Sequence, residues 1–201
     1  MARIILASAS PRRKDILEQV GISCEVIPSS IDEDLITADS PSALVEALSK
    51  AKAEDVAAHF ENDFVVIGAD TVVVKDSKVL GKPSNEAEAH KMLQMLQGNR
   101  HEVFTGVTLI SVSGGKGLID TFHVRTIVDM IPMTPELITS YIQTGEPMDK
   151  AGGYGIQGRG AAYIRDIAGD FFNVVGLPIS TVLSRLEHMG VKSLLNDDFI
   201  S

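Results

Sequence analysis

The chain has 201 residues, of which 44% are hydrophobic and 22% are charged, a balance typical of a globular protein with a buried core. Its 18 lysines and arginines stand against 27 aspartates and glutamates, so the formal net charge is −9. A protein that grips long nucleic acid through its phosphates needs a basic surface, so this charge argues against such a partner. A small anionic ligand is still compatible, because a local cluster of cations can oppose the net charge.

The cysteine content and the apolar runs indicate the compartment. Cys24 is the only cysteine, which excludes an intrachain disulfide and a cysteine zinc site. No stretch approaches the roughly 18 apolar residues of a membrane span, and the apolar run "IILA" near the start is too short for a secretory signal. We therefore expect a cytoplasmic protein without membrane contact, folded as a single domain over residues 1–201 with two lobes.

The hydrophobic pattern predicts strands and helices that alternate along the chain. The first half is expected to hold a strand over 3–8, a helix over 14–20, an edge strand over 23–29, a long helix starting at Ser40-Pro41, and two strands within 63–83 joined by a tight turn at Asp76-Ser77. The second half is expected to hold a helix within 84–99, strands over 101–112 and 117–131, a short helix capped by Thr134, a glycine-rich and then strand-like segment over 149–176, and a helix within 177–190. This order predicts an α/β fold with a mixed sheet.

Polar and cationic side chains gather where the first strand gives way to the first helix. The segment "LASASPRR" contains Ser8, Arg12 and Arg13. Backbone N–H groups at a helix N-terminus, together with two guanidinium forks, form a site suited to an anion such as phosphate. The alternative is that Ser10-Pro11 simply caps the helix and that both arginines are solvated. The segment alone leaves both interpretations open.

Asp70 is a carboxylate inside the apolar strand "VVIGADTVVV". An unpaired charge is costly there, so Asp70 must be paired, metal-bound, protonated or placed where the strand opens into a cleft. Lys82, at the far end of the next predicted strand, falls opposite Thr71 after a two-residue turn and opposite Asp70 after a three-residue loop. A shared face would bring Lys82 within about 5–8 Å of its partner, either as a structural ion pair or as part of a catalytic site.

Lys52 interrupts an apolar helical stripe formed by Val45, Leu48 and Val56. Such a lysine either extends its ammonium to the solvent at the rim of the stripe or binds a ligand. Glu33 lies in the acidic run 32–34, which is either a solvated loop or a source of oxygen ligands for a cation such as Mg²⁺.

The segment "GGYGIQG" satisfies the spacing G-x-G-x-x-G at Gly153, Gly155 and Gly158. A dinucleotide-binding fingerprint requires a preceding buried strand, whereas "TGEPMDKA" is polar and turn-like, so we do not expect dinucleotide binding. Gln157, inside this loop, can offer both a donor and an acceptor to the edge of a nucleotide base.

Several of these segments together resemble the signature segments of the Maf family of nucleoside triphosphate pyrophosphatases. They are "LASASPRR", "GADTVV", "GKP", "TGV", "TGEPMDKAGGYGIQG" and "GDFFNVVGLP", which span Leu6 to about Pro178. The resemblance implies an elongated mixed sheet flanked by helices, with a central cleft between two lobes, as in inosine triphosphate pyrophosphatases. It also implies a homodimer. The sequence "DKAGGYGIQG" is similar to the branch of the family that acts on dTTP and UTP.

The resemblance further implies which residues line the cleft: Ser8, Arg12, Arg13, Glu33, Lys52, Asp70, Lys82 and Gln157. Asp70 would be the proton acceptor, with Arg13 and Lys82 assisting catalysis, and Arg12, Thr71 and Gln157 would bear on base selection. We further expect Glu33 and Asp70 to hold a divalent metal cation, Mg²⁺ or Mn²⁺. Two alternatives are a house-cleaning enzyme for modified pyrimidine triphosphates and a non-catalytic nucleotide sensor linked to division arrest.

Overall fold

The computed structural model describes residues 3–61 and 63–191, and within them it contains a seven-stranded sheet. Its strands are β1 (Arg3–Ala7), β2 (Glu25–Val26), β3 (Phe64–Lys75), β4 (Lys78–Leu80), β5 (Arg100–Ser113), β6 (Lys116–Met130) and β7 (Ile164–Ala168). The sheet runs in the order β2-β1-β3-β5-β6-β7, and β4 pairs with β3. Because β1 is parallel to β2 and β3 while β3–β4 and β6–β7 are antiparallel, the predicted α/β class with a mixed sheet is confirmed.

Helices alternate with the strands, as the hydrophobic pattern predicted. They are α1 (Pro11–Gln19), α2 (Pro41–Ala57), α3 (Glu86–Leu96), α4 (Pro135–Ile142), α5 (Phe171–Val175) and α6 (Ile179–His188). Side-chain caps start four of them: Ser40 accepts from Ala43 N, Asn85 accepts from Glu88 N, Thr134 accepts from Leu137 N, and Asp170 accepts from Asn173 N. No helix among the described residues is both long and apolar enough to cross a membrane.

Three local predictions were wrong. Helix α1 begins at Pro11 rather than residue 14, because proline suits the first turn of a helix. Strand β4 ends at Leu80, so Lys82 is not on it. The apolar run 171–175 forms α5 instead of continuing the strand-like pattern, with Asp170 Oδ1 accepting from Asn173 N at 3.1 Å at its start. A short apolar run fits either period, and here the local cap favours the helix.

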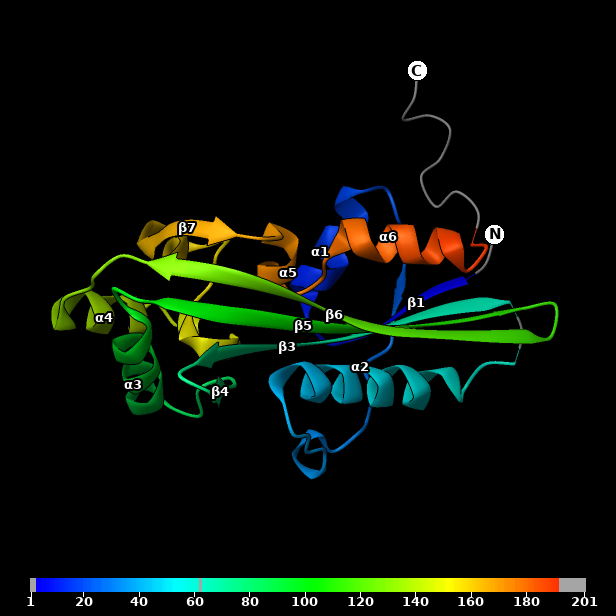
Figure 1. Cartoon of the computed structure of the whole chain (residues 1–201), viewed down its shortest axis with the longest axis horizontal. Helices are drawn as coiled ribbons and strands as arrows, with labels where there is room; N and C mark the ends of the chain where they lie inside the picture. Colours follow the sequence, from blue (N-terminus) through cyan, green and yellow to red (C-terminus); the bar gives the residue numbers. More distant parts are fainter. Residues whose placement is uncertain (1–2, 62, 192–201) are drawn as a thin grey trace, which may run out of the picture. The chain divides into compact units, whose positions relative to one another are not determined.

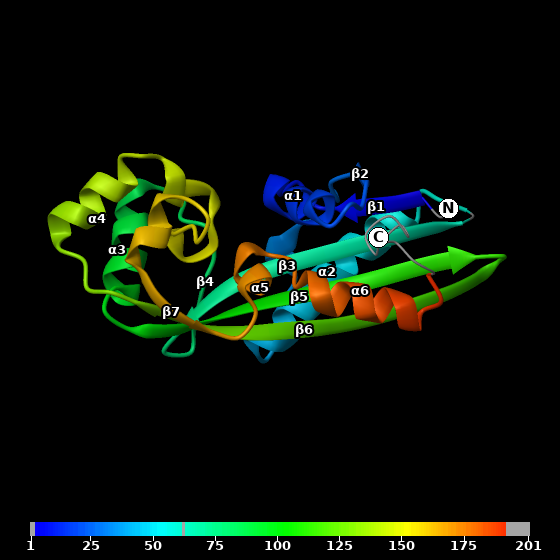
Figure 2. The ribbon, with the colours of Figure 1, turned by 90° about the horizontal axis from the view of Figure 1, so that it is seen from above.

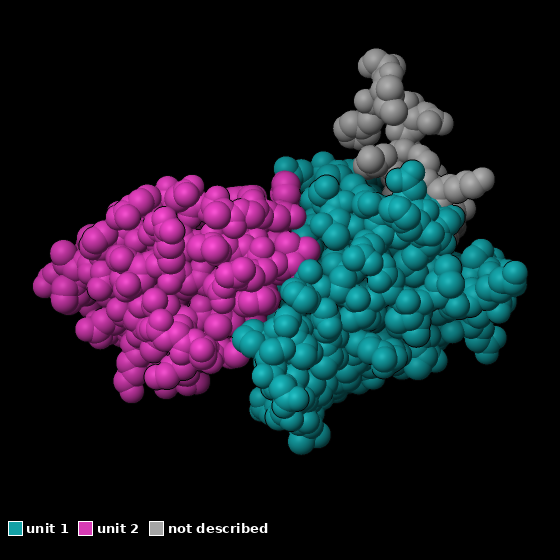
Figure 3. All heavy atoms as spheres, in the orientation of Figure 1, with its two compact units in different colours: residues 1–70, 105–123, 176–201 teal, residues 71–104, 124–175 magenta. Residues whose placement is uncertain are grey.

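The chain forms two compact units, coloured separately in Figure 3. The first consists of residues 1–70, 105–123 and 176–201, and the second of residues 71–104 and 124–175. Strands β3, β5 and β6 each contribute residues to both units. The central cleft between two lobes that the resemblance implies stays a prediction.

Each unit has its own apolar core. In the first, α2 lies against one face of the sheet, and α1 and α6 lie against the other (Figures 1 and 2). One cluster of this core consists of Ile5, Ala7, Ala53, Val56, Phe64, Val66 and Ile110. In the second unit α3 and α4 pack beside each other (Figure 2). Its core includes Val73, Leu80, Met92, Leu93, Leu96, Val128, Met130, Ile138, Tyr141 and Tyr154.

Candidate active site

A buried ion pair joins α2 to β3 in the first unit. Lys52 Nζ donates to Asp70 Oδ1 at 2.7 Å, and the two side chains are only 9% and 11% exposed. The same ammonium lies 2.9 Å from Oε1 of Glu33, whose side chain is 55% exposed. Of the possibilities open for Asp70, the structure therefore shows pairing, and one cation connects two carboxylates from separate segments.

Helix α2 is placed for this contact by its apolar stripe and by a glycine on β3. Val45, Leu48 and Val56 are buried together with Lys52, so the lysine lies on the inner face of the helix. A Cβ on Gly68 would come within 2.4 Å of Ser49 O, so only glycine lets α2 approach β3 this closely, two residues before Asp70. Lys52 consequently meets Asp70 instead of extending to the solvent.

The segment that carries Glu33 is tied to the same helix one turn further on. Asp55 Oδ2 accepts from Ser30 N at 2.8 Å and from Ser30 Oγ at 3.3 Å. Asp32 Oδ1 accepts from Asp34 N at 3.2 Å and so starts the short 3₁₀ turn Glu33–Leu35. Glu33 is therefore held beside Lys52 by contacts on both sides of it.

Arg13 is buried within the first turn of α1. Its Nε donates to Gly176 O and its Nη1 donates to Ser8 Oγ, both at 2.8 Å. Ser8 Oγ also accepts from Ser10 N at 3.2 Å. Burial lowers the pKa of the Arg13 guanidinium, and the nearby Asp70 carboxylate opposes this shift. Arginine stays protonated in proteins, so Arg13 is a fixed cation in the electrostatic neighbourhood of Asp70.

The arrangement of Arg13 bears on one of the two interpretations of the segment "LASASPRR", that both arginines are solvated, and the anion site stays a prediction. Both arginines cannot be simply solvated, because Arg13 is only 7% exposed and its guanidinium is oriented by Ser8. Ser10 occupies the N-cap position of α1 but makes no side-chain capping bond. Arg12 is partly exposed beside it. The segment therefore presents one buried and one partly exposed guanidinium at a helix N-terminus.

The remaining predicted residues, Thr71, Lys82 and Gln157, belong to the second unit. The two-residue turn at Asp76-Ser77 pairs Lys75 with Lys78 and Val73 with Leu80, and β4 then ends. Lys82 lies two residues beyond this ladder, so the expectation that it is on the strand is wrong. The two-residue turn gives the register for which Lys82 was expected opposite Thr71, and that placement stays a prediction. Lys82 and Gln157 are exposed, and Thr71 is partly buried.

The glycine-rich loop lacks the context of a dinucleotide fingerprint. Two 3₁₀ turns, Glu146–Asp149 and Ala151–Gly153, precede it in place of a buried strand. The expectation that this loop is not a dinucleotide site is therefore consistent with its structure.

The donor set of Glu33 and Asp70 fits a hard divalent cation in part. Their carboxylate oxygens already converge on one cation, the ammonium of Lys52. Among residues 3–61 and 63–191, no three His, Cys, Asp or Glu side chains cluster so that they could hold a metal ion. The protein thus offers two carboxylates, which suits a Mg²⁺-like ion that keeps waters and takes further oxygens from phosphates.

Some well-connected residues were not singled out by the sequence patterns. Glu146 and Tyr141 make several hydrogen bonds to the glycine-rich loop. Glu146 lies inside the quoted segment "TGEPMDKAGGYGIQG", but no pattern in that segment connects it to residues 13 and 14 positions further on. The carbonyl of Gly176, which holds Arg13, also gives no signal in sequence, because it is a backbone group.

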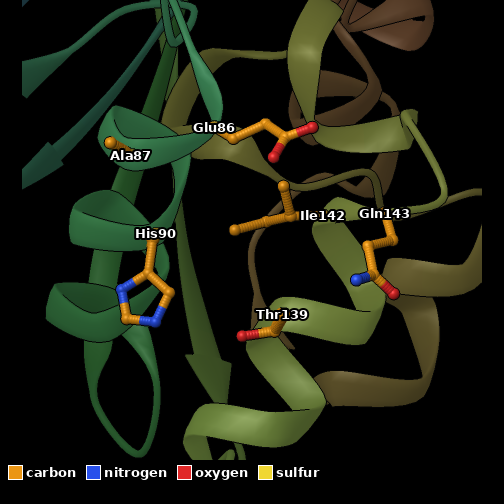
Figure 4. Close-up of a pocket in the computed structure, with 6 residues that line it drawn as sticks. All are labelled: Glu86, Ala87, His90, Thr139, Ile142 and Gln143. Carbon is orange, nitrogen blue, oxygen red and sulfur yellow. The ribbon is translucent and has the colours of Figure 1, made fainter.

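A separate groove of about 290 Å³ lies between α3 and α4 in the second unit (Figure 4). It is lined by Glu86, Ala87, His90, Thr139, Ile142 and Gln143. None of the predicted site residues lines this groove, so it is distinct from the candidate active site.

Comparison with known proteins agrees with the motifs. The family described as Maf-like protein matches residues 3–189. A dTTP/UTP pyrophosphatase of Bacillus thuringiensis is 47% identical over 191 residues, covering 95% of this chain and 97% of that protein. A dTTP/UTP pyrophosphatase of Alkaliphilus metalliredigens is 50% identical over 179 residues, covering 89% of this chain and 92% of that one. Among solved structures, the Ham1 protein of Staphylococcus aureus has a TM-score of 0.49 at 15% identity, covering 93% of this chain and 99% of that chain. From the match over residues 3–189 and the identity to these relatives, the chain belongs to the Maf family.

Proposed function

We propose that this protein is a nucleoside triphosphate pyrophosphatase that hydrolyses dTTP and UTP to the nucleoside monophosphate and pyrophosphate. Relatives that are 47–50% identical over most of their length carry the name dTTP/UTP pyrophosphatase. The observation that carries the proposal is the buried Asp70 carboxylate, whose burial is costly without a counter-charge. It is paired with Lys52 at 2.7 Å and interacts electrostatically with the buried cation of Arg13.

The cations suit the substrate. A nucleoside triphosphate carries about four negative charges near neutral pH, so its site must gather positive charge. Arg12, Arg13 and Lys52 offer three cations in the first unit, and Lys82 offers a fourth from the second. A guanidinium clasps phosphate oxygens through parallel hydrogen bonds, and Arg13 is already oriented by Ser8 and Gly176.

Asp70 is the proposed general base. It takes a proton from the attacking water, whose oxygen forms a bond to the α-phosphorus. The bond between the α-phosphorus and its bridging oxygen breaks, and pyrophosphate leaves with that electron pair. Arg13 and Lys82 stabilise the charge that develops on the phosphoryl oxygens.

A divalent cation would be held by Glu33 and Asp70. When bound, such an ion supplies charge neutralisation and polarisation at the phosphoryl group. Lys52, which contacts both carboxylates, keeps them close to each other.

Base selection is assigned to Arg12, Thr71 and Gln157. The amide of Gln157 carries both a donor and an acceptor, so it can match the edge of a pyrimidine, and its exposure leaves it accessible to a ligand. These roles are part of the proposal.

The test is hydrolysis of dTTP in H₂¹⁸O with and without Mg²⁺. We expect metal-dependent release of pyrophosphate, with the label in dTMP, because water attacks the α-phosphorus. Asp70→Asn should lower kcat by at least about 10²-fold, the usual scale for loss of a general base. The exposed Asp39→Asn serves as the control and should keep the wild-type rate.

Two results would contradict the proposal. Label in the pyrophosphate would place the attack on the β-phosphorus. Tight binding of dTTP without turnover would favour the nucleotide sensor instead. A panel that includes modified pyrimidine triphosphates separates dTTP and UTP hydrolysis from the house-cleaning alternative by their kcat/KM values.

A further inference from the structure

The glycine-rich loop that contains Gln157 is fastened to one carboxylate, that of Glu146. Its Oε1 accepts from Gly160 N at 3.0 Å, and its Oε2 accepts from Arg159 N at 2.8 Å. The hydroxyl of Tyr141 donates to the same Oε1 at 2.8 Å. The carboxylate therefore accepts two backbone N–H groups that directly follow the loop residue Gly158.

Tyr141 extends this anchor to the other end of the loop. Its hydroxyl oxygen accepts from Gly155 N at 3.0 Å, while its proton goes to Glu146. Tyr141 is only 2% exposed, and its ring lies 5.5 Å from that of Tyr163, so the hydroxyl is held rigidly. Gln157 thus lies on a short stretch of backbone whose two ends are bound to one Tyr141–Glu146 unit.

Gly158 and Gly160 approach this unit closely. A Cβ on Gly158 would come within 2.4 Å of Glu146 Oε2, and one on Gly160 would come within 2.5 Å of the Tyr141 hydroxyl. A Cβ on Gly155 would come within 2.6 Å of Lys150, whose Nζ donates to Glu146 O at 2.7 Å. Of the glycines in the spacing that imitates a dinucleotide fingerprint, Gly158 is thus the one packed directly against the Glu146 carboxylate, whereas Gly153 has a positive φ of 72°.

The negative charge of Glu146 matters for these contacts. Burial alone would raise its pKa, but hydrogen bonds from Gly160 and Arg159 hold the pKa of Glu146 below its ordinary value. Every partner of the carboxylate oxygens is a donor, which suits an ionised carboxylate and does not suit an amide or a neutral acid.

We propose that Glu146 is a positioning residue that, together with Tyr141, fixes the loop 155–160 so that Gln157 presents its amide to the pyrimidine base. This role rests on the proposed function. Glu146 touches no substrate in it and acts only through the conformation of the loop.

The test compares Glu146→Gln, Gln157→Ala and the double variant. In Glu146→Gln an NH₂ group replaces one carboxylate oxygen and meets an N–H or O–H donor that the oxygen accepted before. The backbone amides of Arg159 and Gly160 should therefore exchange with solvent at least about tenfold faster. The selectivity for dTTP and UTP over GTP, as kcat/KM, should fall by about tenfold or more, mainly through KM. The double variant should lose no more selectivity than Gln157→Ala alone.

Two further variants separate positioning from general damage to the fold. Tyr141→Phe keeps the packed ring but removes the hydroxyl, so it should show the same pattern to a smaller extent. Glu136→Gln alters an exposed glutamate on α4 and should leave amide exchange and selectivity unchanged. A folding defect would instead lower kcat alike for every substrate and lower the thermal midpoint measured by circular dichroism.

The outcomes are distinct. If wild-type protein prefers dTTP and UTP but Glu146→Gln keeps that preference while its loop amides exchange faster, the positioning role is overturned. The same holds if selectivity losses of the two single variants add fully in the double variant. If the wild type releases no pyrophosphate from any nucleoside triphosphate, the proposed function itself fails, and the role of Glu146 fails with it.

Discussion

Lys52 is the counter-ion of two carboxylates, Asp70 and Glu33, which differ in exposure. Asp70 is almost fully buried, so its desolvation is offset only by a close partner, and Lys52 supplies it at 2.7 Å. Glu33 is 55% exposed, and water screens its interaction with the ammonium. The pair with Asp70 is therefore the stronger of the two, and the contact with Glu33 is the weaker one.

A second buried polar pair, His101 with Tyr154, lies in the second unit. His101 Nε2 and the Tyr154 hydroxyl are 2.7 Å apart, and their rings meet edge to face. Within the part of the chain that the structure describes, His101 Nδ1 has no hydrogen-bond partner. Burial lowers the pKa of His101 to about 4, and the positive charge of Lys75 acts in the same direction. The neutral imidazole is therefore the form that the fold accommodates.

The stability of the protein should consequently depend on pH through His101. Its pKa is lower in the folded state, about 4, than the ordinary 6.5, so the unfolded state binds the proton more tightly. The contribution is fully present above pH 6.5 and is lost as the pH falls towards 4, by about 2 kcal/mol at pH 5. Urea unfolding at pH 7.5 and pH 5 measures it, and His101→Gln provides the comparison. An equal loss in His101→Gln would assign the pH dependence to other groups.

At the scale of elements, α2 is the part of the first unit that organises the candidate site. It carries Lys52 to β3, ties the Glu33 segment through Asp55, and packs against both β3 and β5. On β5 the close approach is again made at a glycine. A Cβ on Gly106 would come within 2.2 Å of Val45 O, a backbone atom that cannot rotate away.

Substitution of this glycine should therefore strain the packing of α2. We expect Gly106→Ala to lower the free energy of unfolding by about 1–3 kcal/mol, the range for overpacking a close contact. Gly117→Ala is the matched control in a strand, because its nearest neighbour would be Val112 Cγ2 at 3.9 Å. Denaturant unfolding of both variants measures the difference, and equal stability of the two would contradict the steric argument.

The elements that sequence predicted well are those with a local signal. The stripe containing Lys52, the cap at Thr134 and the turn at Asp76-Ser77 follow from periodicity, capping and turn chemistry within a few residues. The contacts that build the site are not local. Arg13 binds the carbonyl of Gly176, 163 residues away, so no window of sequence contains both partners. Glu146 binds Gly160 only 14 residues away, but no periodic, capping or turn signal connects the two. The length of β4 was also missed: its pairing ends at Val73 and Leu80 although β3 continues to Phe64, and no signal in the sequence marks that end.

At the scale of the whole molecule, the net charge of −9 is divided unevenly between the two units. The first unit has 9 lysines and arginines against 17 aspartates and glutamates, and the second has 9 against 10, so Arg12, Arg13 and Lys52 belong to the more acidic unit. Local cations can attract a compact polyanion even where the surrounding surface is acidic, and an acidic surface repels extended nucleic acid. The homodimer that the resemblance implies stays a prediction, and sedimentation would test it against the 21.6 kDa of one chain.

The two units should unfold together. Strands β3, β5 and β6 run through both units. When such a strand loses its pairing in one unit, the part of the same strand that belongs to the other unit is destabilised as well.

The three tyrosines, Tyr141, Tyr154 and Tyr163, all lie in the second unit, and tryptophan is absent. Tyrosine fluorescence therefore reports on the second unit alone, whereas far-UV circular dichroism reports on both. We expect one thermal midpoint by both probes, as in a two-state transition. Midpoints separated by more than about 4 °C, or roughly 1 kcal/mol for a chain of this size, would show that the units unfold independently.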